Sequence, residues 1–215
     1  MGARMAGIRS KQKAERPEQI LDAAFDEFVA TGYGAARLED IGKRIGVTKG
    51  TIYFYYGSKE NLFKTLITSL SAPLATEFHE KEWEWSDDIA KDIDYIISRL
   101  YKFIFENPKF RELLRLLVSE ADRFPEFVDD NFAEFADPIM TSLSKRFDLA
   151  VAAGEIEPAN TYELARFVVA PAVFLNITSL LFGNRRAIDC DAFISTHRKV
   201  MLRGLLKPRA GGRGA

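Results

Sequence analysis

The sequence contains very few of the side chains that form disulfides or bind transition metals. It has one cysteine, Cys190, and two histidines, His79 and His197, in 215 residues. A lone thiol cannot form an internal disulfide, which fits a reducing compartment such as the cytoplasm. A structural zinc site takes Cys and His ligands in larger number, so we expect no metal and no other cofactor.

Motifs of catalysis are also absent. The chain has no nucleophile elbow around a serine, no glycine-rich loop for phosphate, and no Cys-His pair at metal-ligand spacing. Glu112 and Glu120 are paired carboxylates of a kind that is common on solvated helix faces. We therefore expect that the protein is not an enzyme.

Long apolar runs are limited to one. No apolar segment follows the start, so we expect no secretory signal. The longest uncharged run, "FVVAPAVFLNITSLLFGN" at 167–184, is near the length of a membrane span. It contains Pro171, Asn176, Thr178 and Ser179, and no second span accompanies it. We predict a helix that is buried on most sides, in a protein without a membrane partner.

The charge is small overall but uneven along the chain. The formal net charge is −1, while residues 1–65 hold 11 Lys and Arg against 8 Asp and Glu. A basic front and an acidic rear indicate that only one end meets a polyanion. The basic segment 1–15 is either a disordered solubilising tail or an arm that follows a nucleic-acid backbone or enters a minor groove.

Hydrophobic spacing is helical almost throughout the chain. No long period-two alternation and no Asn-Gly or Asp-Gly hairpin signal occurs. Helix ends are predicted at Gly32, Gly154 and Gly183, with a bend at Pro73 and a kink at Pro138. We expect an all-α protein of about nine helices. Its parts are a flexible basic arm at 1–15, a three-helix helix-turn-helix domain at 16–65, a larger helical bundle at 66–207 and a disordered tail at 208–215.

The segment "LEDIGKRIGVTKGTIYFYY" predicts two short helices joined by a tight turn. Gly46 gives the turn its backbone freedom, and Thr48 can cap the second helix. Ile52 and Tyr56, four residues apart, point inward. The outward surface then holds Lys49, Gly50, Thr51, Tyr53, Phe54 and Tyr55. Such a surface suits the DNA major groove, although spacing alone also fits an ordinary helical hairpin.

Residues 16–63 resemble the DNA-binding domain of the TetR family of transcriptional regulators. The stretches "ILDAAFDEFVATGY" and "DIGKRIGVTKGTIYFYYGSKENLF" carry the resemblance. It implies a two-domain, all-helical dimer that binds a palindromic operator. It also implies release of the operator when a small molecule occupies the C-terminal domain. Beyond about residue 65, only the order and lengths of the predicted helices match the family.

The resemblance also assigns roles to residues of the helix-turn-helix. Residues that it places against bases are Lys49, Gly50, Thr51, Tyr53 and Phe54. Those that it places against phosphates are Thr48, Tyr55 and Lys59, the last of them at the positive N-terminus of the fourth helix.

This chain departs from the family at the start of the second helix. Relatives usually carry Thr or Ser where this chain has Ala36 and Arg37, so the hydroxyl cap is lost, at about 1 kcal/mol of helix stability. We expect Arg37 to supply a charged phosphate contact instead. Glu39 replaces a basic residue of many relatives. It either accepts a hydrogen bond from cytosine N4 or favours the helix N-terminus.

The last two helices form the dimer interface if the resemblance holds. Candidate interface residues are Phe167, Leu175, Phe193, His197, Val200, Met201 and Gly204. His197 is either a satisfied interface histidine or a ligand of a bound molecule.

The bundle is rich in aromatic residues, which form ordinary cores and also suit a flat or greasy ligand. Candidate ligand-binding residues are Tyr101, Ile104, Leu117, Glu120, Phe135 and Phe174. Glu120 either meets a cationic ligand or pairs with Arg115 or Arg123. Asn176 and Thr178 are either polar groups of a pocket or interface hydrogen-bonding groups.

These features together predict a cytoplasmic, ligand-responsive, DNA-binding transcriptional regulator. The simplest form is a homodimeric repressor that binds a palindromic duplex operator and is released by a small hydrophobic or aromatic inducer. A ligand-dependent activator is one alternative. A helical module that binds another protein and no DNA is a second alternative.

Overall fold

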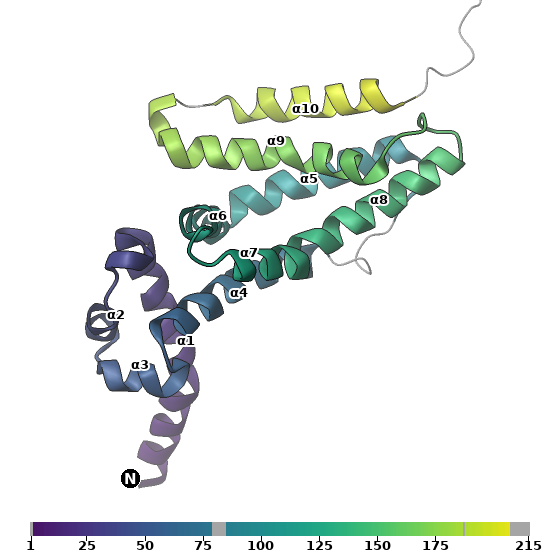
Figure 1. Ribbon diagram of the computed structural model, residues 1–215. Helices are drawn as coiled ribbons and strands as arrows, with labels where there is room; N and C mark the ends of the chain where they lie inside the picture. The colour runs from purple at the N-terminus through teal and green to yellow at the C-terminus, as the bar shows by residue number, and fades with distance from the viewer. Residues whose placement is uncertain (1, 79–84, 187, 207–215) are drawn as a thin grey trace, which may run out of the picture. The chain divides into compact units, whose positions relative to one another are not determined.

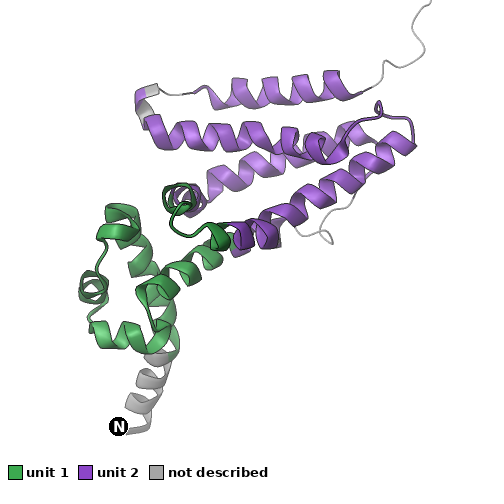
Figure 2. Ribbon diagram, in the orientation of Figure 1, with its two compact units in different colours: residues 1–71, 116–128 green, residues 72–115, 129–215 purple. Residues whose placement is uncertain are grey.

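The computed structural model describes residues 2–78, 85–186 and 188–206, and the regular elements there are all helical (Figure 1). The prediction of an all-α protein is confirmed. The chain divides into two compact units (Figure 2): unit 1 holds residues 1–71 and 116–128, and unit 2 holds 72–115 and 129–215. Residues 116–128, which we assigned to the rear bundle, therefore belong to the front unit. The expected tail at 208–215 lies outside the described residues.

Unit 1 contains α1 (Gly2–Ala35), α2 (Leu38–Ile45), α3 (Lys49–Tyr56) and the first part of α4 (Lys59–Glu77). It also takes in the end of α6 (Pro108–Glu120) and the start of α7 (Pro125–Asn131). α1 begins at Gly2, so the segment expected as a flexible arm is helical, while the side chains of residues 2–13 lie outside the description. At Gly32 the backbone leaves the helical region with φ 76°, at the predicted end of the helix.

An aromatic cluster joins residues 116–128 to the rest of unit 1. The rings of Phe28, Tyr33, Phe63 and Phe124 contact one another with centroids 5.0–5.8 Å apart. Edge-to-face aromatic pairs contribute energy beyond their buried area. The cluster therefore packs the half-buried Phe124 against residues of α1 and α4.

Unit 2 is a helical bundle built on α5 (Ile89–Glu106), α8 (Asp137–Ala152), α9 (Thr161–Phe182) and α10 (Cys190–Leu205). A 3-10 turn, η3 (Gly183–Arg186), follows α9. Asp88 and Asn160 cap α5 and α9 by accepting backbone N–H bonds. By length and apolarity α9 would also be able to cross a membrane. The prediction that it is buried on most sides is wrong for the single chain, because one of its faces packs on α5 and α8 in the bundle core and much of the rest is exposed.

The helical segment around the expected kink at Pro138 consists of three elements. α7 passes into a π-helical turn, η2 (Phe132–Ala136), which is followed by α8 with Pro138 in its first turn. A proline inside a helix removes one N–H donor and its ring clashes with the carbonyl four residues earlier. A wider turn just before Pro138 accommodates that clash, so the expected kink is a π turn.

Candidate functional site

The turn between α2 and α3 is set by two glycines and a threonine. Gly46 ends α2 in the left-handed region with φ 66°. A Cβ on Gly42 would lie 2.5 Å from the Val47 carbonyl oxygen, so the backbone of the turn passes too close to α2 there for any side chain. Thr48 caps α3, its Oγ1 accepting from the Thr51 N–H at 3.3 Å. Local sequence thus fixes the angle at which α3 leaves the turn.

The inner and outer faces of α3 are distinct. Ile52 and Tyr56 are buried, and the Tyr56 hydroxyl donates to the Pro17 carbonyl at 2.8 Å. On the outer face Phe54 is 77% exposed and Tyr53 is 43% exposed. Of the other residues predicted to face DNA, Thr48, Lys49 and Gly50 are exposed, while Thr51 and Tyr55 are half-buried. The structure therefore presents an exposed aromatic face with one cation at its start.

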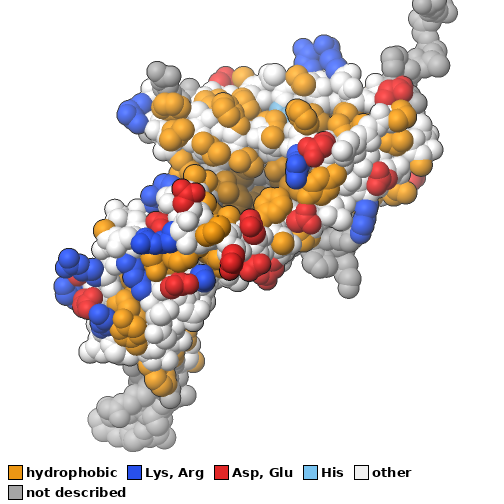
Figure 3. All heavy atoms as spheres, viewed as in Figure 1, with side chains coloured by type: hydrophobic (Ala, Val, Ile, Leu, Met, Phe, Trp, Pro, Cys, Tyr) orange, Lys and Arg blue, Asp and Glu red, His pale blue; other side chains and the backbone are white. Residues whose placement is uncertain are grey.

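Several of the described cations on unit 1 are paired with carboxylates. Ion pairs join Lys49 to Glu39, Lys43 to Asp40, Arg44 to Glu27 and Lys64 to Glu60, all at 2.8–2.9 Å. On the face of unit 1 that is visible in Figure 3, Lys and Arg side chains lie beside Asp and Glu side chains. The surface near α3 is less cationic than its count of basic residues suggests.

Lys59, a predicted phosphate contact, is engaged within the protein. Its ammonium donates to the Gly34 carbonyl at 3.3 Å and lies 4.7 Å from the centre of the Tyr33 ring. Burial, and then the charge of Arg123, lower its pKa. Arg123 sits over the same Tyr33 ring at 5.1 Å. A phosphate contact by Lys59 stays a prediction, and it requires this ammonium to exchange partners.

Arg37 occupies the N-cap position of α2 with an extended backbone and makes no side-chain cap bond. The loss of the hydroxyl cap, expected from Ala36 and Arg37, is therefore confirmed. The Arg37 side chain is exposed. Its contact with phosphate stays a prediction.

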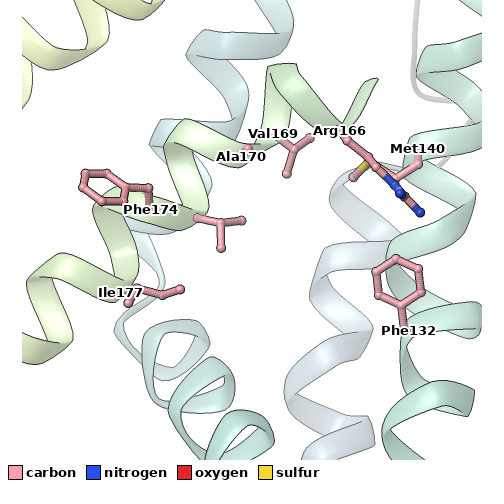
Figure 4. Close-up of a pocket in the computed structure, with 8 residues that line it drawn as sticks. Phe132, Met140, Arg166, Val169, Ala170, Phe174 and Ile177 are labelled. Carbon is pink, nitrogen blue, oxygen red and sulfur yellow. The ribbon is translucent and has the colours of Figure 1, made fainter. Parts of the chain in front are cut away.

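Unit 2 contains an open apolar pocket of about 580 Å³ beside α9 (Figure 4). One wall comes from α9 and the other from η2 and α8. The lining residues are Phe132, Met140, Arg166, Val169, Ala170, Val173, Phe174 and Ile177. Arg166 is the charged member, and its Nη1 lies 3.1 Å from Glu163 Oε1.

The structure does not bring the six predicted ligand residues together. Phe174 lies on the pocket, whereas Tyr101, Ile104 and Phe135 are buried in the core of unit 2. Leu117 and Glu120 belong to unit 1, where Glu120 lies 3.7 Å from Arg123. The spacing of the apolar residues on α9 would have indicated one wall. The other wall depends on how η2 and α8 fold back, which periodicity does not show.

The predicted interface residues fall into three groups: exposed, half-buried and buried. Phe167 and Val200 are exposed, and Gly204 faces open space. Phe193 is half-buried and stacks on Phe174 with ring centroids 6.2 Å apart. Leu175, His197 and Met201 are buried within unit 2 itself. These last three side chains therefore form core of one chain rather than exposed surface.

His197 is held inside unit 2 by Tyr101. The Tyr101 hydroxyl and His197 Nδ1 lie 3.1 Å apart, and Nε2 is buried with no hydrogen-bond partner. Burial, with the nearby charge of Arg198, lowers the pKa of His197 to about 4, and burial raises the pKa of Tyr101 to about 12. Both side chains are therefore neutral at physiological pH. Within the described residues, no group of three or more His, Cys, Asp and Glu side chains could hold a metal ion.

The lowered pKa of His197 makes stability dependent on pH. In the unfolded protein His197 binds a proton below about pH 6.5, whereas in the folded protein it binds one only below about pH 4. We expect this residue to contribute a loss of about 1–2 kcal/mol in unfolding free energy between pH 7 and pH 5. Urea titrations of the wild type and His197→Gln at both pH values measure it. An equal pH-dependent loss in the variant would contradict the assignment to His197.

Models of two protein domains match this chain. One, described as bacterial regulatory proteins, tetR family, matches residues 20–66. The other, described as the C-terminal domain of AefR-like transcriptional repressors, matches residues 96–170. The two matches together span more than half of the chain and lie in its front and rear parts respectively.

Individual proteins match over most of their length. The HTH-type transcriptional regulator SrpR of Pseudomonas putida is 24% identical over 193 residues, covering 88% of this chain and 84% of SrpR. Among solved structures, Salmonella enterica GusR is 26% identical with a TM-score of 0.66, covering 89% of this chain and 95% of GusR. SmeT, the repressor of the Stenotrophomonas maltophilia multidrug efflux pump SmeDEF, is 19% identical with a TM-score of 0.68, covering 93% of this chain and 94% of SmeT. At that identity it shows a shared fold.

Proposed function

This chain belongs to the TetR family of transcriptional regulators, and from that premise we propose that it is a homodimeric repressor released from a palindromic operator by a small apolar ligand. The family consists of soluble DNA-binding regulators with a helix-turn-helix, rather than of enzymes. The cytoplasm is the proposed compartment. The observation that carries the DNA-binding role is the exposed aromatic face of α3, which Thr48 caps and Ile52 anchors in the core.

α3 suits the major groove in residue type as well as in exposure. Aromatic edges such as Tyr53 and Phe54 can contact thymine methyl groups, and the Tyr53 hydroxyl can bond to base edges. Gly50 has no side chain to keep the backbone from the groove wall. In a twofold dimer, two such helices read half-sites about one helical turn, roughly 34–36 Å, or a multiple of it apart.

The dimer is supported by an exposed apolar stripe on α9. Phe167, Phe174 and Leu181 recur every seven residues, and Ala170 and Ile177 follow the first two at a spacing of three. Such alternation of three and four is the seam of a helix that packs on another helix. Phe167 is 67% exposed, Phe174 57% and Leu181 61%. Hydrophobic side chains accordingly gather over α9 in Figure 3. We propose that a second copy of the chain covers this stripe.

The ligand site that we propose is the pocket beside α9. Its volume of about 580 Å³ lies within the range of roughly 300–1,000 Å³ that small-molecule sites occupy. Its walls are aliphatic and aromatic apart from Arg166, which supports a small hydrophobic or aromatic ligand. Because Ala170, Phe174 and Ile177 line the pocket and also belong to the stripe, an occupant can favour one packing of the two copies over another. Release then follows from the different DNA affinities of the two states.

Filling the pocket should weaken ligand binding strongly and spare DNA binding. We expect Val173→Trp to weaken the binding of 1-aminoanthracene, a neutral aromatic fluorophore, about tenfold or more, since the indole occupies the space of the probe. Fluorescence titration measures this. Leu149→Trp is the matched control, because Leu149 is exposed on α8 and does not line the pocket. Equal affinity in the wild type and in Val173→Trp would place the ligand elsewhere.

Selection from a random duplex library tests the function as a whole. Purified protein is mixed with random-sequence duplexes at low salt, and the retained DNA is sequenced. Enrichment of a palindrome without ligand supports a dimeric repressor and supplies the operator. Enrichment only in the presence of ligand supports a ligand-dependent activator. If no sequence is enriched in either case, α3 contacts another protein rather than DNA.

A further inference from the structure

An ion pair joins the two helices of the helix-turn-helix at their first turns. The Lys49 ammonium lies 2.8 Å from Glu39 Oε1, and both side chains are about half exposed. Glu39 is in the first turn of α2, and Lys49 is the first residue of α3. The pair therefore lies at the start of the helix that we place in the major groove.

The pair has a local physical cause. A lysine at a helix N-terminus opposes the helix dipole, and α3 has no acidic residue in its first turn to compensate. Glu39 supplies that negative charge from α2. The hydrogen bond from Lys49 lowers the pKa of Glu39 and raises that of Lys49, so both groups are charged at neutral pH.

Lys49 is also the one cation within α3, Lys49–Tyr56. The nearby cations on α2 have carboxylate partners of their own, with Lys43 on Asp40 and Arg44 on Glu27. Because these two charges are compensated and Arg37 lies at the start of α2, the state of Lys49 decides the charge that α3 itself presents to a phosphate backbone.

We propose that Glu39 is a positioning residue that withholds Lys49 from DNA phosphates and thereby raises discrimination between the operator and random DNA. The proposal rests on the DNA-binding function proposed above. On random DNA, Lys49 exchanges a carboxylate for a phosphate and gains little. On the operator, base contacts by Tyr53 and its neighbours on α3 hold the helix in a register in which Lys49 keeps Glu39 as its partner, so this complex loses no ion pair. Penalising the wrong partner in this way is a general route to specificity.

Removal of the carboxylate tests the proposal. Glu39→Gln frees one cation, so the slope of log affinity against log salt for a random-sequence duplex should steepen by about 0.9. At about 0.1 M salt this corresponds to about eightfold tighter binding of random DNA. Affinity for the selected operator should rise less, so the ratio of the two affinities falls. Fluorescence anisotropy at several salt concentrations measures both.

Two further variants separate this role from a general charge effect. Glu60→Gln removes a carboxylate of the same unit that pairs with Lys64 at 2.8 Å within α4, and it should leave the slope unchanged. In a Lys49→Gln background, Glu39→Gln should also have no effect, because Glu39 acts through Lys49.

Three outcomes would overturn the proposal. If Glu39→Gln weakens the operator and leaves random DNA unchanged, Glu39 contacts a base directly. If tightening persists in the Lys49→Gln background, Glu39 repels phosphates by itself. If the wild-type protein binds neither duplex, the DNA-binding function itself fails. That result is visible in the wild-type protein, whereas the other two outcomes appear only in the variants.

Discussion

Replacing Arg146 with methionine should lower the free energy of unfolding by about 3–5 kcal/mol. Arg146 Nε lies 2.6 Å from Asp92 Oδ2, and the two side chains are only 4% and 5% exposed. Asp92 also accepts from the Ser86 N–H at 2.9 Å, and Arg146 donates to the Ser86 carbonyl at 3.3 Å. Methionine fills a similar volume but leaves a buried carboxylate without its counter-charge, which is where the loss arises.

The charge explanation can be separated from packing by a double variant. Asp92→Leu combined with Arg146→Met removes both charges, and it should recover most of the stability that the single variant loses. Lys102→Met, at an exposed position of α5, controls for the substitution itself. Urea denaturation at neutral pH measures all four proteins. If the double variant is as unstable as Arg146→Met, the loss comes from packing rather than from the unpaired Asp92.

Local signals in the sequence predicted the front of the molecule well. Gly32, Gly46 and Thr48 each act on their own backbone or on a residue a few positions away, and each stands where it was expected. The inward positions Ile52 and Tyr56 follow from helical period and are buried. Such features depend on interactions between residues that are close together in the sequence, so one sequence is enough to predict them.

Contacts between distant residues were not predictable in the same way. Phe124 joins unit 1 because its ring meets Tyr33 and Phe63, and no periodicity relates those positions. The pocket beside α9 takes Phe132 and Met140 from a π turn and a following helix whose path depends on Pro138. Two of the predicted ligand residues, Tyr101 and Phe135, are therefore buried aromatic core, because composition cannot distinguish a ring that fills a core from one that lines a pocket.

Gly42→Ala should weaken operator binding about a hundredfold, since one methyl group acts directly on the geometry of the helix-turn-helix. The new Cβ would lie 2.5 Å from the Val47 carbonyl oxygen, a backbone atom that cannot rotate away. Val47 is tied to the same place because its N–H donates to the Gly42 carbonyl at 2.9 Å. α3 must therefore shift as a body relative to α2, and its outer face then loses its register with the base edges.

Gly34→Ala is the control for Gly42→Ala, because a Cβ at Gly34 of α1 lies no closer than 3.8 Å to its nearest neighbour, an ordinary contact, and alanine favours a helix. Circular dichroism should show both variants folded, and anisotropy with the selected operator should separate them. The affinity for random DNA adds a second distinction. If Gly42→Ala loses operator affinity but keeps its affinity for random DNA, base contacts on α3 are displaced while phosphate contacts survive. If operator affinity is unchanged, the backbone at Val47 adjusts without moving α3, and the geometry of the turn does not limit recognition of the operator.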